Sequence, residues 1–176
     1  MPITHYGTTW WGKEWLNALS GIDNLNRIPR GKTYANTGKV LSVKFDYVSH
    51  TIKARVEGNW DPFYSVKIVL PPFTQEEKDK LISAILKTPI VLAKLAAKEL
   101  APEIYNIAIN ANIKIFPESW EDFKMTCSCP DFAVPCKHIA ATIFKISEEI
   151  DTNPFILFLL RGLDLVEEIK KSLHLH

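Results

Sequence analysis

The stretch CSCPDFAVPCKH, residues 127–138, contains all three cysteines of this 176-residue chain and ends on a histidine. Three thiolates and one imidazole are a usual ligand set of a closed, tetrahedral structural zinc site. In an extended segment, residues i and i+2 point to the same side, so Cys127 and Cys129 can bind one ion together. The stretch therefore predicts a zinc site formed by Cys127, Cys129, Cys136 and His138.

The second half of the stretch predicts where a helix begins. On a regular helix, side chains two residues apart differ in direction by about 200°, so Cys136 and His138 cannot both face one ion from within it. We therefore expect Cys136 before the helix or at its cap, and His138 in the first turn. An amphipathic helix then follows, and its apolar side consists of Ile139, Ile143, Ile146 and Ile150.

Other cysteine chemistries fit the stretch less well. A disulfide framework usually has an even number of cysteines and follows a secretory signal, and neither is seen here. A nucleophilic Cys–His pair leaves two thiols without a role, and a zinc deaminase needs a further cysteine where Ile139 stands. A redox-sensing thiol cluster stays open as an alternative. Because a closed four-ligand site leaves no position for a hydrolytic water, we expect a structural zinc and no enzyme activity.

The same residues resemble a known family. The pattern CxC-x6-CxH at 127–138 is similar to the SWIM-type zinc finger, and WWGK (10–13), RGKTYA (30–35) and the segment 153–162 resemble stand-alone prokaryotic SWIM proteins. The resemblance implies zinc binding by the four residues named above, interaction with DNA or protein, and no established catalytic activity. It also implies a partner, since such proteins are often encoded beside a Swi/Snf-type helicase-like ATPase.

Composition and charge limit the functions that the chain can have. Hydrophobic residues make up 47% and charged residues 23%, which are typical globular values. No apolar run approaches the roughly 20 residues that span a bilayer, and free thiols without an export signal favour the cytoplasm. Residues 1–72 carry nine Lys/Arg and five Asp/Glu, a balance of +4, whereas residues 127–176 carry five and seven, a balance of −2. A nucleic-acid footprint must therefore come mainly from the N-terminal part.

The patterning predicts an α+β fold, an antiparallel β-meander followed by helices. A short helix capped by Thr8 or Thr9 ends near Gly21, with its two tryptophans interpreted as core. Alternating segments at 39–45, 51–57 and 64–70, joined by short connections, form the meander. Leu41 is expected on the same side as Val43 and Phe45. Helices follow at 74–86, 88–100 and 102–111, an extra strand at 113–116, the helix after Cys136, and two more helices capped near Asn153 and Asp164.

Basic side chains gather at three places in this plan. A basic turn is expected to carry Arg27, Arg30 and Lys32, and Lys137 lies between two zinc ligands. The outward face of the meander gathers Lys44, Lys53, Arg55 and Lys67. We consider these eight residues as candidate nucleic-acid contacts. The alternative is that a solvated strand face simply carries lysines, and the sequence does not decide between the two.

The sequence suggests three regions: an N-terminal α+β region at 1–116, the zinc finger at 117–152 and a helical segment at 153–176. Besides the less favoured redox sensor, two functions remain open. The first is an adaptor that serves a Swi/Snf-type DNA-dependent ATPase and has some DNA contact of its own. The second is direct nucleic-acid binding without an obligatory partner.

Overall fold

The computed structural model describes residues 5–22, 26–59, 61–131 and 135–174. Its strands form one antiparallel sheet in the order β1-β2-β3-β4. The first three, β1 (Val40–Asp46), β2 (Thr51–Val56) and β3 (Tyr64–Val69), are the predicted meander. The fourth, β4 (Lys124–Cys127), pairs with β3 and leads directly into the zinc stretch. The predicted α+β class is confirmed, and the zinc finger shares its sheet with the N-terminal strands.

Two details of the predicted strands are wrong. Residues 113–116 do not form a strand, because the place beside β3 is taken by β4. Leu41 does not share a side with Val43, because the pairing of β1 with β2 shifts between Val40 and Ser42. This irregularity leaves Leu41 54% exposed.

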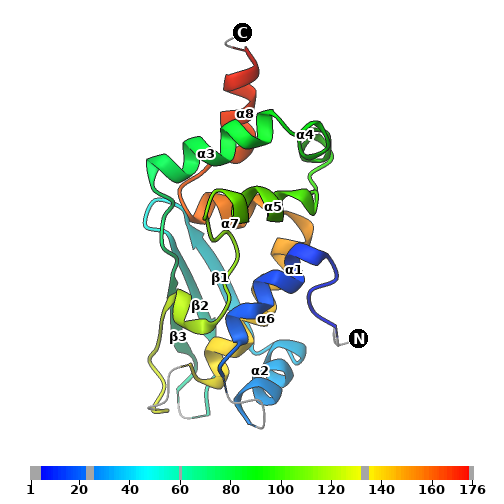
Figure 1. Ribbon diagram of the computed structural model, residues 1–176. Helices are drawn as coiled ribbons and strands as arrows, with labels where there is room; N and C mark the ends of the chain where they lie inside the picture. Colours follow the sequence, from blue (N-terminus) through cyan, green and yellow to red (C-terminus); the bar gives the residue numbers. More distant parts are fainter. Residues whose placement is uncertain (1–4, 23–25, 60, 132–134, 175–176) are drawn as a thin grey trace.

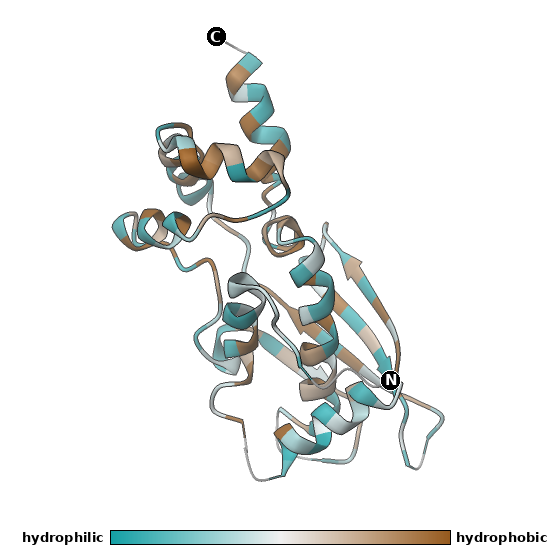
Figure 2. Ribbon diagram, turned by 90° about the vertical axis from the view of Figure 1, so that its right-hand side faces the viewer, coloured by the Kyte–Doolittle hydropathy of each residue, from teal (hydrophilic) through white to brown (hydrophobic). Residues whose placement is uncertain are grey.

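The helix α6 (Lys137–Thr152) packs across the inner face of the sheet and forms the centre of the core (Figure 1). It begins at the predicted cap, and its four isoleucines at 139, 143, 146 and 150 are fully buried. Along the strands that it covers, apolar and polar residues alternate (Figure 2). This alternation places Ile52, Ala54 and Val56 against the helix and leaves Lys53 and Arg55 outside.

The N-terminal helix packs on α6 through two tryptophans. It consists of α1 (Trp10–Trp15) and the 3-10 turn η1 (Leu16–Leu19), and the hydroxyl of Thr9 caps it. The indole N–H of Trp11 donates to the carbonyl oxygen of Ile150 at 2.7 Å, and that of Trp15 donates to Ile143 at 2.9 Å. Both rings are buried, so the interpretation of the tryptophans as core is confirmed.

The predicted basic turn is wrong, because Arg27, Arg30 and Lys32 lie in a helix, α2 (Arg27–Asn36). Pro29 occupies the first turn, where its missing N–H costs no hydrogen bond. Gly31 faces α6, and a Cβ at this position would lie 2.6 Å from the Cβ of Ala140. The proline and the glycine therefore serve a helix start and a close helix contact, not a loop.

The remaining helices form a second layer at the opposite end of the molecule (Figure 1). They are α3 (Gln75–Leu86), α4 (Pro89–Ala96), α5 (Glu103–Asn110), α7 (Phe155–Leu160) and α8 (Leu165–His174); a short turn, η2 (Trp120–Asp122), precedes β4. Buried Arg161 joins this layer to the sheet. Its Nε donates to the carbonyl oxygen of Pro71 at 2.8 Å, and its guanidinium stacks on Phe73. Within the described residues, no helix is both long and apolar enough to cross a bilayer.

Candidate metal centre

The first two cysteines are positioned by the edge of the sheet. Cys127 ends β4 opposite Val66, on the face that α6 covers. Ser128 continues the pairing beyond the strand, since its N–H donates to the carbonyl oxygen of Ser65 at 3.0 Å and its hydroxyl accepts from the Ser65 N–H at 2.9 Å. Ser128 is thereby held against β3, which leaves Cys127 and Cys129 on either side of it to face the same point.

The other two side chains come from the start of α6. Cys136 is the N-cap residue, with an extended backbone (φ −94°, ψ 178°), and His138 lies in the first turn. This arrangement confirms the prediction that Cys136 lies at the cap of the helix and His138 in its first turn. The N-terminal end of a helix also favours negative charge, so a thiolate at Cys136 is stabilised there.

The four side chains converge on one point. Their ligand atoms all lie within 4.8 Å of one another. The Nδ1 of His138 is 3.7 Å from the sulfur of Cys136 and 3.8 Å from that of Cys127. A tetrahedral ion with bonds of about 2.3 Å to sulfur and about 2.0–2.1 Å to nitrogen would separate its ligands by about 3.6–3.8 Å. The residues therefore fit a zinc ion bound through Nδ1.

The pKa values of the thiols reflect how closely they face one another. A hydrogen bond with Cys136, together with burial, raises the pKa of Cys127. The same hydrogen bond lowers the pKa of Cys136, and burial raises the pKa of Cys129. The thiols therefore share protons that a divalent cation would displace, because zinc is bound by thiolates.

The surroundings of the site come from the N-terminal half of the chain. The rings of Tyr64, on β3, and Tyr34, on α2, lie 4.9 and 5.6 Å from the imidazole of His138. Cys136 is 1% exposed and His138 is 4% exposed. Three thiolates and one imidazole, shielded in this way, fit a four-coordinate zinc ion of the structural kind.

A comparison with known protein families also indicates a zinc-binding protein. The SWIM zinc finger family matches residues 118–147, which include all four side chains of the cluster. The chain therefore contains a SWIM-type zinc finger, whose four clustered side chains fit zinc.

One curated relative is the uncharacterized protein Rv2102 of Mycobacterium tuberculosis. It is 32% identical over 154 residues, which are 88% of this chain and 55% of the relative. The chain thus spans about half the length of the relative that it matches. No solved structure matches the chain.

The structure divides the eight candidate nucleic-acid residues into two groups. Lys44, Lys53 and Lys67 are directly paired across β1, β2 and β3, and Arg55 lies beside them opposite Ser65. Lys124 joins this row, because its partner Val69 is on the same face as Lys67. The sequence alone could not place Lys124 in this row, because its position depends on the pairing of β4 with β3. We call these five side chains the basic sheet face: Lys44, Lys53, Arg55, Lys67 and Lys124.

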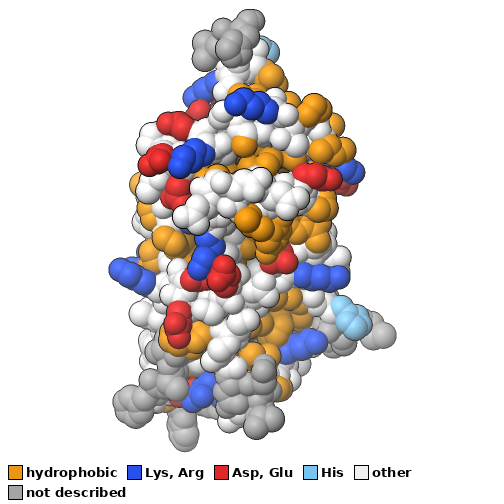
Figure 3. All heavy atoms as spheres, viewed as in Figure 1, with side chains coloured by type: hydrophobic (Ala, Val, Ile, Leu, Met, Phe, Trp, Pro, Cys, Tyr) orange, Lys and Arg blue, Asp and Glu red, His pale blue; other side chains and the backbone are white. Residues whose placement is uncertain are grey.

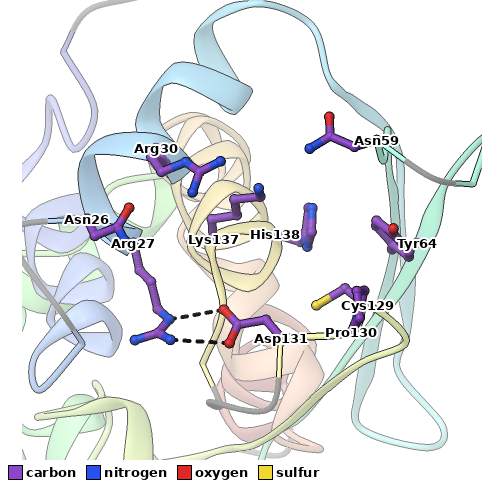
Figure 4. Close-up of a pocket in the computed structure, with 10 residues that line it drawn as sticks. All are labelled: Asn26, Arg27, Arg30, Asn59, Tyr64, Cys129, Pro130, Asp131, Lys137 and His138. Carbon is purple, nitrogen blue, oxygen red and sulfur yellow. Dashed lines mark hydrogen bonds and ion pairs between the residues drawn. The ribbon is translucent and has the colours of Figure 1, made fainter.

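The second group lies beside the zinc site. Arg27, Arg30 and Lys137 line a cavity of about 260 Å³, together with His138 (Figure 4). Lys32 is half-buried in α2 and is not among the residues that line this cavity. Sequence reasoning missed Asn26, Asn59 and Tyr64 at the same place, and no local signal connects these three separate segments.

Proposed function

We propose that this protein is a non-enzymatic, cytoplasmic interaction module that contacts DNA through the basic sheet face and serves a Swi/Snf-type DNA-dependent ATPase as an accessory subunit. The zinc ion folds the module and takes no part in chemistry. The DNA contact rests on the register of the sheet, and the ATPase partner rests on the family resemblance.

The observation that carries the DNA contact is the row Lys44, Lys53, Lys67. Each lysine is directly opposite the next across the ladder. Like charges in opposed positions destabilise a sheet, so such a row is costly unless a polyanion binds to it. The helical side of the molecule differs, because acidic and basic side chains are intermixed there (Figure 3). The row therefore favours one face of the molecule for phosphate contact.

The salt dependence of DNA binding tests this contact. Each neutralised phosphate contributes a slope of about −0.9 to log K against log [salt] on duplex DNA. Changing both Lys44 and Lys67 to Gln should lower the magnitude of the slope by about 2. The matched control Lys170→Gln, at an exposed position of α8, should leave the slope unchanged. Equal slopes for the double variant and the wild type would exclude the basic sheet face as the DNA contact.

Copurification tests the ATPase partner. An accessory subunit should retain the ATPase from native lysate after nuclease treatment, whereas a protein that meets the ATPase only on shared DNA should lose it. Binding to DNA with a steep salt slope but without nuclease-resistant retention of the ATPase would favour the second function, direct nucleic-acid binding without an obligatory partner.

A further inference from the structure

The cavity beside the zinc site is built from segments far apart in the sequence. The start of α2 contributes Asn26 and Arg30, the start of α6 contributes Lys137 and His138, and Asn59 and Tyr64 lie on the other side (Figure 4). Its volume of about 260 Å³ far exceeds the roughly 10–15 Å³ that one water molecule needs, so it admits a polyatomic ligand.

At this cavity, His138 has a buried nitrogen with no hydrogen-bond partner among the residues that the structure describes. Its Nδ1 faces the sulfur atoms, so Nε2 projects from the opposite edge of the ring. Nε2 is buried, and none of the described residues hydrogen-bonds to it. When Nδ1 binds the metal, Nε2 carries the proton, and metal-bound histidines nearly always donate this proton to a carboxylate, a carbonyl oxygen or water. The ring therefore requires an acceptor.

Three cationic side chains that donate and cannot accept line the cavity: Arg27, Arg30 and Lys137. Among the described residues, no carboxylate pairs with Arg30 or Lys137, and the Lys137 ammonium lies 5.3 Å from the Tyr34 ring. The carboxylate at the rim, Asp131, is engaged by Arg27 through two hydrogen bonds of 3.1 and 3.2 Å. Asn26 caps α2 without a side-chain cap hydrogen bond, so the positive end of a ten-residue helix also opens here.

We propose that this cavity is a binding site for one phosphate group, held by Arg30, Lys137 and the Nε2–H of His138. The donors come from separate segments around the cavity, which suits a tetrahedral oxyanion better than a planar carboxylate. The site is separate from the basic sheet face and does not depend on it. The phosphate group belongs either to a small molecule or to the end of a nucleic-acid strand. The same three donors would bind it in both cases.

The first test uses the zinc-loaded 176-residue chain and inorganic phosphate in a sulfate-free buffer. Phosphate should bind and shift the His138 Nε2–H resonance in a proton–nitrogen NMR spectrum, because that proton gains an acceptor. Arg30→Gln and Lys137→Gln should each weaken binding by about tenfold or more, as expected for a charge-assisted hydrogen bond. Lys170→Gln, at an exposed position of α8, should leave the affinity unchanged.

An unmoved His138 resonance at saturating phosphate would overturn the proposal, and so would acetate binding as tightly as phosphate. Zinc content and melting temperature verify the fold of each variant. If Arg30→Gln does not fold, the His138 Nε2–H resonance of the wild-type protein decides whether the cavity binds phosphate.

The second test identifies the source of the phosphate. Short oligonucleotides with and without a 5′-phosphate are compared in the Lys53→Gln background, which weakens the sheet contact. Tighter binding of the phosphorylated strand, lost in Arg30→Gln, identifies a strand end as the ligand. Equal binding of the two strands, alongside phosphate binding that depends on Arg30, identifies a small phosphate compound. Binding of neither inorganic phosphate nor the phosphorylated strand through Arg30 overturns the site, whatever the sheet face does.

Discussion

Gly31 of α2 lies so close to Ala140 of α6 that a Cβ at position 31 would come within 2.6 Å of the Cβ of Ala140. The same Cβ would lie 3.0 Å from the backbone oxygen of Lys137. The closeness of the two helices places Tyr34 against the zinc-binding His138 and the start of α2 against the phosphate cavity. The approach of α2 to α6 is therefore part of both sites.

Gly31→Ala should destabilise the protein despite the higher helix propensity of alanine. The propensity gain is about 0.5–1 kcal/mol, but inserting a methyl group between packed backbones costs about 1–3 kcal/mol. A net loss of about 1–2 kcal/mol is expected in chemical denaturation. Thr33→Ala, at an exposed position of the same helix, is the control and should change the stability by no more than about 0.5 kcal/mol. A stabilised Gly31→Ala would show that the helices can separate without cost.

Cys136→Ser should abolish stoichiometric zinc binding and unfold the stretch around residues 127–138. Structural zinc sites contribute on the order of 10 kcal/mol, and a three-ligand site loses most of this. Elemental analysis and hydrogen exchange measure the two effects, and the β1–β2 pair should keep its protection. The control is Ser128→Ala, which removes a hydrogen bond to Ser65 and should cost about 1 kcal/mol while zinc is retained. Full zinc content and an unchanged melting temperature in Cys136→Ser would contradict the assignment.

Lys53→Glu should make the sheet more stable and DNA binding weaker. Lys53 lies directly between Lys44 and Lys67, so an acidic residue there replaces two repulsive pairs by two attractive ones. A gain of about 0.5–1 kcal/mol is expected in thermal denaturation at low salt, and it should shrink as salt is added. Lys170→Glu is the control for the general effect of a charge change. Destabilisation by Lys53→Glu at low salt would mean that the row carries no repulsion.

The Asp122 carboxylate should contribute stability that is lost in acid. Burial raises the pKa of this carboxyl, but hydrogen bonds from the Glu118 N–H, Lys114 and the Ser119 N–H outweigh it and lower the pKa. A lowered folded-state pKa means that the contribution is complete above the unfolded value of about 3.9 and disappears as pH falls through the folded value. Asp122→Asn should cost about 1 kcal/mol or less near neutral pH, because solvent still reaches the partly buried carboxylate and screens its interactions.

The measurement is the difference in unfolding free energy between the variant and the wild type across a pH series, since zinc release in acid affects both proteins alike. A difference that does not shrink at all as the pH falls below the unfolded pKa of about 3.9 would rule out the carboxylate as its cause.

Features formed by residues close together in the sequence could be predicted, whereas features that join distant segments could not. The zinc cluster was predictable because its four residues lie within residues 127–138 and the i, i+2 spacing constrains their geometry. The meander was predictable for the same local reason. The helix α2 was not, since Pro29 and Gly31 are usual loop signals and the contact with Ala140 that explains Gly31 is 109 positions away. The division into regions at 116 and 152 stays a prediction.

Strand β4 could not be predicted either, because only its pairing with β3 identifies it as a strand. A four-residue segment has too little alternation to be distinguished from residues 113–116, and pairing with β3 alone decides between them. The phosphate cavity requires α2, Asn59, β3 and α6 at once, so no single stretch of sequence contains it.

The ladder formed by Ser128 and Ser65 has a consequence for the fate of the protein in the cell. Strand β4 covers the hydrogen-bonding edge of β3, and its last residue is Cys127. Loss of the ion would loosen this cover and present β3 as an unprotected edge, which is a template for pairing with other chains. Starvation for zinc should therefore lead this protein to self-associate into insoluble material, so the ion protects solubility as well as shape.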